Sequence, residues 1–265
     1  MFKEKKLYIS ISAHDGSSGG GANTFAWNFS RYLNRKGITT TNSLIRASHA
    51  IIIANKVNKF SLKIAKARGC FILHRLDEDF ETGVPMKPKH KEIFKINKLA
   101  NVTVFQSVFV KENVQPHVKS KNWEIIINGA DSKVFPFHSK SGPFVGHITN
   151  SVGSKKRLDI LDDTISRYPQ ERFLLVGNHR NYFNDFSRHH NVTLEEPVST
   201  TELSDYHRQM KCLFFPSERD PCPNTVVEAI LSGVPICYNN HGGTKEIVKH
   251  CGLPLGKFDE LLENY

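Results

Sequence analysis

The stretch from Phe214 to Val248 constrains the fold more than any other part of the chain. It opens as an apolar strand, and after a loop with two prolines a short helix begins at Asn224 or Thr225. This helix is apolar nearly all round, which predicts that it is buried. A second strand leads into Gly242-Gly243. The order predicts a βαβ unit whose loops lie at the carboxyl ends of parallel strands, where open α/β sheets bind ligands.

One acidic residue falls inside the apolar helix. Glu228 lies about one turn from its start, among valines, alanine and isoleucine. An ionised carboxylate in such surroundings is costly unless it accepts hydrogen bonds. Two neighbouring hydroxyl groups of a ligand would supply them, so that Glu228 is predicted as a ligand contact. The alternative is a helix carboxylate that reaches the surface.

Composition indicates a two-domain protein without membrane spans. The chain has 265 residues, of which 39% are hydrophobic and 23% charged, as is usual for a soluble globular protein. No apolar run approaches the roughly 20 residues needed to cross a bilayer, and the N-terminus lacks the apolar core of a signal peptide. The five scattered cysteines favour buried thiols in a reducing compartment. We therefore expect a cytoplasmic protein.

The net charge of +10 is unevenly distributed. Residues 1–140 hold 23 Lys and Arg against 10 Asp and Glu, and the remainder holds 13 against 16. This favours an anionic partner for the first half: a phosphorylated acceptor, an acidic lipid surface or nucleic acid. The alternative is a solvated face. The lysine-rich helix predicted at 87–99 is either a peripheral contact with an anionic membrane or a core-packed helix with exposed lysines.

Strands and helices alternate along the first half, which predicts a parallel sheet. A glycine-rich loop at 14–21 stands between a strand and a helix at 22–36, where backbone N–H groups can bind an anion. The dinucleotide fingerprint is absent. A polar segment at 137–143 marks the boundary between domains 1–138 and 143–265. Strands are predicted at 50–54, 70–74, 103–106, 123–127, 144–148, 173–176 and 192–194, and helices at 58–68, 89–99, 107–114 and 158–168.

These motifs together resemble the retaining GT-B glycosyltransferases of family 4, the glycosyl transferases group 1. The signature of that family begins with an acidic residue, which seven residues separate from a glutamate. A Gly-x-Pro turn and a Gly-Gly-x-x-Glu-Ile segment follow. Here the elements are Asp220, Glu228, Gly233 to Pro235 and Gly242 to Ile247. The resemblance covers most of the second half and islands of the first, among them Ile127 to Phe135. It implies an α/β fold of the GT-B class, with two Rossmann-like domains whose parallel sheets face each other across a cleft. Residues 1–138 would then form the acceptor domain, and residues 143–265 the nucleotide-sugar donor domain.

The resemblance also implies which residues bind the donor. Glu228 takes the place that contacts the donor ribose, and Lys156 the place that contacts the diphosphate, with Lys155 as the near alternative. Gly20 and Gly21 match a segment that closes over the donor phosphates or the acceptor; a plain turn is the alternative. The remaining predicted donor-binding residues are Asn224, Thr225, Gly242 and Gly243.

Two residues are predicted by resemblance to stand at the reacting sugar. Asp220 replaces a glutamate that contacts the transferred sugar and is one methylene shorter. His74 ends a predicted strand where the family often carries a histidine that faces this sugar. A structural histidine is the alternative, and Asp77 or His14 could take the role instead. The sequence also departs from the family at Pro221, at Cys222 and at Ser151, where the family has an arginine.

The leading hypothesis is a retaining glycosyltransferase that moves a sugar from UDP- or GDP-sugar to a hydroxyl of a glycan or lipid-linked acceptor. The resemblance implies no protein nucleophile, no metal and no cofactor besides the nucleotide sugar. The departures, and a C-terminal end without the family's long helices, leave a non-catalytic sugar-nucleotide-binding partner subunit as the alternative. Nucleic acid is not expected, because the basic half has charge but no recognition motif.

Overall fold

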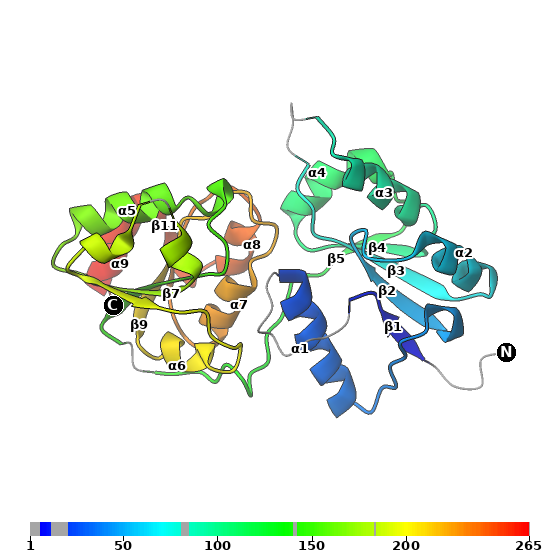
Figure 1. Ribbon diagram of the computed structural model, residues 1–265, viewed down its shortest axis with the longest axis horizontal. Coiled ribbons are helices and arrows are strands. Elements are labelled where there is room, and N and C mark those ends of the chain that lie inside the picture. Colours follow the sequence, from blue (N-terminus) through cyan, green and yellow to red (C-terminus); the bar gives the residue numbers. More distant parts are fainter. Residues whose placement is uncertain (1–5, 12–20, 81–84, 140–141, 183, 265) are drawn as a thin grey trace. The chain divides into compact units, whose positions relative to one another are not determined.

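The computed structural model describes residues 6–11, 21–80, 85–139, 142–182 and 184–264, which form two compact units (Figure 1). Described residues up to Asn128 belong to the first unit, and those from Gly129 belong to the second. Each unit is built on one parallel sheet with helices packed against it. Among the described residues, no helix is both long and apolar enough to cross a membrane.

The sheet of the first unit follows the chain order, β1-β2-β3-β4-β5, and all its pairs are parallel. Because each right-handed crossover steps to the next strand in the same direction, α2, α3 and α4 lie on one face of this sheet (Figure 1). The strands are β1 (Leu7–Ile9), β2 (His49–Ile53), β3 (Phe71–Leu76), β4 (Val102–Phe105) and β5 (Trp123–Ile125), and the helices are α1 (Gly21–Arg35), α2 (Lys59–Ala67), α3 (Pro88–Asn97) and α4 (Val108–Val118).

Local sequence explains these elements. Asn58 caps α2 by accepting a hydrogen bond from the Ser61 N–H at 3.0 Å, and Ser107 caps α4 in the same way. β2 ends in three isoleucines and β3 begins with Phe71, Ile72 and Leu73, apolar stretches that are typical of strands covered on both faces. Ile52 and Ile72 of these strands pack with the buried side chains of α2.

The sheet of the second unit has the order β11-β10-β9-β6-β7-β8. The chain builds outward from β6 to β8 and then returns to place β9 on the other side of β6, so the strand order reverses between β6 and β9. Ligands of open α/β sheets bind at such a switch point, beyond the carboxyl ends of the strands. The strands are β6 (Phe144–Thr149), β7 (Arg172–Gly177), β8 (Val192–Glu195), β9 (Met210–Phe215), β10 (Ile236–Tyr238) and β11 (Gly252–Pro254), and the helices are α5 (Leu158–Arg167), α6 (Leu203–His207), α7 (Asn224–Leu231), α8 (Thr244–Val248) and α9 (Phe258–Asn264).

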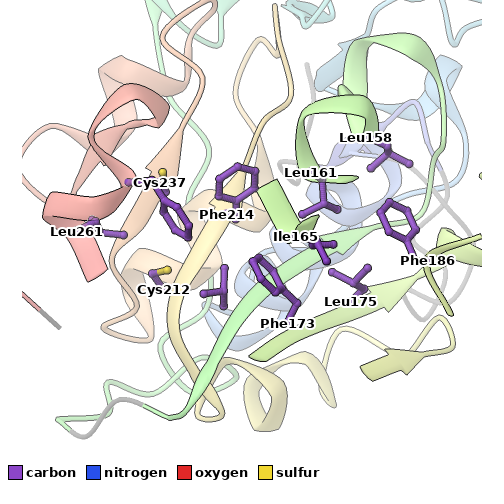
Figure 2. Packing of buried hydrophobic residues seen from close by; sticks show 12 residues of the cluster. Leu158, Leu161, Ile165, Phe173, Leu175, Phe186, Cys212, Phe214, Cys237 and Leu261 are labelled. Carbon is purple, nitrogen blue, oxygen red and sulfur yellow. The ribbon is translucent and has the colours of Figure 1, made fainter. Parts of the chain in front are cut away.

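Apolar side chains of β9 supply both faces of this sheet, because successive residues of a strand point to opposite sides. Cys212 and Phe214 join the cluster under α5 and α9, which Figure 2 shows with Phe173, Leu161 and Leu261. Leu213 and Phe215 join the cluster on the other face, with side chains of α7 and α8. All five cysteines are free thiols and four of them are buried, as the sequence predicts; only Cys251 is exposed.

Two segments differ from the sequence-based expectation. Residues 129–138 pack with the second unit, so the division lies about ten residues before the one expected from the polar segment. Phe135 is buried against the His207 ring, and the His138 N–H donates to the Ser232 oxygen at 3.0 Å.

The last residues of the chain were not predicted to form regular structure, yet they form β11 and α9. Phe258 of α9 enters the core. These two elements are too short for a periodic pattern to show.

Candidate functional site

Loops that follow β6 and β9 meet at the switch point of the second unit. The Lys156 Nζ lies 3.2 Å from Oδ2 of Asp220 and 5.8 Å from the ring centroid of Phe215, the last residue of β9. The Glu218 N–H donates to the Lys155 oxygen at 2.9 Å. The side chains of Lys156 and Asp220 remain 28% and 19% exposed, so that both are accessible to a ligand. The structure therefore brings together two predicted site residues that are 64 positions apart.

The glycine pair adjoins Asp220. The Gly243 N–H donates to the Asp220 oxygen at 2.9 Å, and Asp220 pairs with Gly242 in an isolated parallel bridge. Gly242 has a φ of +129°, and a Cβ there would come within 3.0 Å of the Asp220 backbone. Only glycine combines this conformation with such a close approach. The predicted Asp220, Gly242 and Gly243 thus form one structural group.

Gly242→Ala should destabilise the second unit by about 1–3 kcal/mol, because alanine adds backbone strain and a clash at this position. Urea unfolding followed by circular dichroism measures the change. Gly256→Ala is the matched control, since a Cβ there meets nothing within 4 Å. Equal stability of the two variants would show that the close approach of Asp220 and Gly242 is not needed.

Glu228 is held in the core of α7, with only 3% of the residue exposed. Burial raises the pKa of its carboxyl group to about 7. Its Oε1 has no hydrogen-bond partner among the described residues. A buried acceptor without a partner is rare in proteins and marks a site where a ligand or water supplies the donor. Glu228 therefore has the surroundings predicted from the sequence and not those of a surface carboxylate.

In the described part of the second unit, two further buried oxygens lack partners, and neither residue was predicted from the sequence to belong to the site. They are the Ser217 Oγ, two residues after β9, and the Thr244 Oγ1, at the first residue of α8. Ser217 is 1% exposed and Thr244 is fully buried. Ser217 lies on the loop after β9 and Thr244 opens the helix after β10, and α8 packs against α7, which carries Glu228. In the sequence, both residues could have been recognised as hydroxyl side chains that lie just after a strand or at the start of a helix.

The first turn of α7 begins at Asn224, as predicted. Pro223 occupies the N-cap position, and no side chain caps the helix. Asn224 and Thr225 are both half-buried. Their predicted contact with the donor remains a prediction.

Arg157 is the cation near Ser151, the position at which the resemblance places an arginine. Its guanidinium pairs with Asp159 at 2.8 Å and with Glu218 at 3.2 Å. Both partners are carboxylates, so its charge is already balanced. Among the ion pairs of the described residues, Lys156 has one carboxylate partner, Asp220, and Arg157 has two, so Lys156 is the better placed of the two cations for a ligand phosphate.

A buried histidine pair stands beside this region and was not predicted. The His147 Nδ1 of β6 lies 2.6 Å from Nε2 of His179, which follows β7. Burial lowers the pKa of His179 to about 4 and that of His147 well below its usual value, with smaller contributions to the His147 shift from His179 and then from Lys156. Both rings are therefore neutral near pH 7 and share one proton in their hydrogen bond. Among the described residues, no group of His, Cys, Asp and Glu could hold a metal ion.

The predicted residues of the first unit have different surroundings. Gly20 lies outside the described residues, and Gly21 is the exposed first residue of α1. His74 is fully buried: its Nε2 lies 2.7 Å from the Ala54 oxygen and its Nδ1 3.1 Å from the Asn97 amide nitrogen. Burial lowers the pKa of His74 to about 4. Because both ring nitrogens are bonded within the core, this geometry favours the structural alternative for His74.

The lysine-rich helix α3 is packed into its unit. Ile93 and Ile96 are buried in the two core clusters of this unit, and the exposed side carries lysines such as Lys91 and Lys95. Lys89 pairs with Glu78 at 2.7 Å. This arrangement is that of the core-packed alternative, and contact of the lysines with an anionic membrane stays a prediction.

Residues 141–260 match the model of the family described as glycosyl transferases group 1. A curated relative, an uncharacterized glycosyltransferase of Haemophilus influenzae, is 25% identical over 124 residues. The aligned part is 45% of this chain and 35% of that protein, so the chain spans about a third of the relative's length. Both matches support a glycosyltransferase, and both fall short of the whole chain.

Solved structures match both units. Sucrose-phosphate synthase of Thermosynechococcus elongatus aligns with a TM-score of 0.72 at 14% identity, over 98% of this chain and 89% of that one. HepE of Anabaena, solved in complex with UDP and glucose, aligns with a TM-score of 0.70 at 14% identity, over 95% and 85% of the two chains. These similarities confirm the predicted fold class, an α/β protein of two Rossmann-like domains of the GT-B type.

Proposed function

We propose that this protein is a glycosyltransferase that transfers a sugar from a nucleotide-diphosphate sugar to a hydroxyl group. The observation that carries the proposal is the buried Glu228 carboxylate with an unpaired oxygen, on the helix that follows β9 at the switch point of a Rossmann-like sheet. Lys156, Asp220 and the glycine pair meet on loops at the same end of that sheet. A ligand that fits must offer hydroxyl donors and negative charge at once. A nucleoside diphosphate offers both.

In this proposal the ribose hydroxyls donate hydrogen bonds to Glu228. The unpaired hydroxyl oxygens of Ser217 and Thr244 are further acceptors and donors for the nucleotide. The structure of HepE with UDP and glucose supports a nucleotide sugar as the class of donor, because that protein aligns over most of this chain. A UDP- or GDP-sugar is the donor that we propose.

Lys156 is proposed to face the diphosphate. Negative charge grows on the leaving diphosphate as the sugar departs, and a preorganised cation beside it lowers the barrier. Asp220 is paired with Lys156 in the free protein, and we propose that it turns to a hydroxyl of the transferred sugar once phosphate takes over the lysine. Lys156 and the backbone groups near Gly242 and Gly243 would supply the stabilisation without a metal.

Retention of the anomeric configuration is the proposed outcome. The Asp220 and Glu228 spacing supports it, since this is the signature that the chain shares with retaining enzymes. The acceptor hydroxyl then attacks from the face that the diphosphate leaves, and a donor phosphate oxygen takes its proton. Catalysis comes from positioning and charge stabilisation. The acceptor is proposed to be a glycan or a lipid-linked sugar.

A thermal-shift screen of UDP-, GDP-, ADP- and CMP-sugars tests the proposal. One base should raise the unfolding temperature by roughly 5 °C or more at about 100 times the dissociation constant. Release of free nucleotide in the presence of sugar acceptors then measures transfer. Failure of every nucleotide to shift the transition at millimolar concentration would refute the donor site.

The same screen distinguishes the second candidate function, a sugar-nucleotide-binding partner subunit. The balanced charge of Arg157 favours this alternative, because it leaves Lys156 without a second cation from that loop. A partner subunit would bind the nucleotide sugar but would release no nucleotide with any acceptor.

A further inference from the structure

Residues 129–138 follow the last residue of the first unit and are fixed to the second unit. The His138 N–H donates to the oxygen of Ser232, the residue after α7, at 3.0 Å. A Cβ at Gly233 would come within 2.7 Å of the Phe137 ring and 2.8 Å of the His138 oxygen. The end of this segment therefore lies directly on the turn after α7. We call the contact of residues 135–138 with this turn and with the end of α6 the linker anchor.

The buried side chain of His207, the last residue of α6, joins the parts of the linker anchor. His207 is 1% exposed, and its ring packs against the Phe135 ring with the centroids 5.6 Å apart. Its Nδ1 lies 3.2 Å from the Ser232 Oγ. One imidazole thus contacts both the segment that enters the unit and the turn on which that segment lies.

Both histidines of the linker anchor bury a ring nitrogen that has no partner. The Nε2 atoms of His138 and His207 are buried and make no hydrogen bond with the described residues. A neutral imidazole has one N–H donor, whereas an imidazolium ion donates from both nitrogens. Protonation would therefore give each ring a charged N–H group that finds no acceptor in the anchor, and a buried charge without a partner is costly.

Burial is the main reason that these rings resist protonation, and the neighbouring charges add to it. Burial lowers the pKa of His207 to about 4, and a charge on His138 would lower it further. The pKa of His138 is also lowered, first by burial and then by the charge of Arg208. Arg208 pairs with the exposed Asp205, and the turn at 232–233 carries no charged side chain. The anchor therefore offers no carboxylate that would stabilise an imidazolium ion.

We propose that the linker anchor is an acid-sensitive switch, in which protonation of His138 and His207 releases residues 135–138 from the turn after α7. A histidine released into water regains its ordinary pKa, so the released form binds protons more tightly than the anchored form. The anchor is accordingly at its most stable above about pH 6.5, and this stability is lost as the pH falls toward 4. The proton is the only ligand required, so the proposal does not depend on the proposed transfer.

Hydrogen exchange of the His138 amide, followed by NMR on the full chain between pH 7.5 and pH 5, tests the proposal. This N–H is bonded to the Ser232 oxygen, so it exchanges only when the anchor opens. Below pH 6.5 its protection factor should fall about tenfold per pH unit for each histidine that takes up a proton, and by about 100-fold for both. The amides of β7 report unfolding of the whole unit. A protection factor at His138 that follows those of β7 would overturn the switch.

Variants that remove one titrating ring should reduce this pH dependence. His138→Gln and His207→Phe should each lower the slope to about tenfold per pH unit, and phenylalanine keeps a ring against Phe135. His190→Gln, an exposed histidine of the same unit, is the matched control and should keep the wild-type slope. If one variant does not fold, the other still decides, because an unchanged slope in either would overturn the role of that histidine in the switch.

Gly233→Ala should open the linker anchor at neutral pH, because the added Cβ would clash with the Phe137 ring and the His138 oxygen. The amide of residue 138 should then exchange rapidly at every pH, while the β7 amides stay protected. Gly69→Ala is the matched control: its φ of +83° is close to the +85° of Gly233, and a Cβ there meets nothing within 4 Å. Wild-type protection in Gly233→Ala would contradict the contact on which the switch depends.

Discussion

Glu228→Gln is expected to make the free protein more stable at pH 8 by about 3 kcal/mol, which is the cost of the pKa rise from 4.5 to about 7. Above pH 7 the carboxyl group is ionised in both the folded and the unfolded chain, and the folded state bears the full cost of burying the charge. Glutamine has the same shape and no charge. Urea unfolding at pH 8 measures the difference.

The stability difference between the wild-type protein and Glu228→Gln should depend on pH. Between pH 7 and pH 4.5 the folded protein takes up a proton at Glu228 that the unfolded chain does not, so that the Glu228 contribution to stability increases as the pH falls. The advantage of Glu228→Gln should therefore shrink over that interval. Glu263→Gln, an exposed carboxylate on α9, is the control and should show neither effect. An advantage that stays constant from pH 8 to pH 5 would contradict the buried, ionised Glu228.

The same variant should bind nucleotide sugar more weakly, by about 1–3 kcal/mol, because the ribose hydroxyls lose a charged acceptor. Wild-type affinity should fall as the pH drops below 7, since protonation of Glu228 removes the acceptor that the ligand prefers. Calorimetry at pH 8 and pH 6 measures both effects. A gain in stability with unchanged affinity would leave Glu228 buried for a reason unrelated to the donor.

Lys156→Ala is expected to lower kcat by about 10²- to 10³-fold, the loss typical of removing one preorganised group from the transition state. Stability should change little, because the Lys156 and Asp220 pair is partly exposed and such pairs contribute about 1 kcal/mol or less. Initial rates with the donor found in the screen measure the effect. The KM for the donor should change less than kcat if the lysine acts mainly on the developing charge.

Lys155→Ala is the matched control, since Lys155 is the neighbouring lysine and its side chain is exposed. It should retain most of the wild-type activity. Equal losses in the two variants would assign the effect to the overall charge of the loop, and a larger loss in Lys155→Ala would move the diphosphate contact to that residue.

Much of the fold was predictable because its signals are local. Apolar runs and turn residues placed β6, β7 and α5 within one or two residues of their observed bounds. Helix α4 is an exception: it runs through Pro116 to Val118, where Lys119 in the left-handed conformation ends it, and the proline favoured an earlier end. Pro116 cannot donate the backbone hydrogen bond to the preceding turn, yet the helix continues for two more residues beyond it.

The sequence by itself determined the α/β class, the switch-point loops and the position of Glu228, because strand periodicity, glycine pairs and a charge in an apolar helix are properties of neighbouring residues. The tertiary structure alone decided that His74 is bonded within the core, that Ser217 and Thr244 bury unpaired oxygens, and that Asp77 is held by Arg75. These properties depend on partners from other segments of the chain. Burial and hydrogen bonding are set by packing in three dimensions, and a linear pattern does not record which atoms lack a partner.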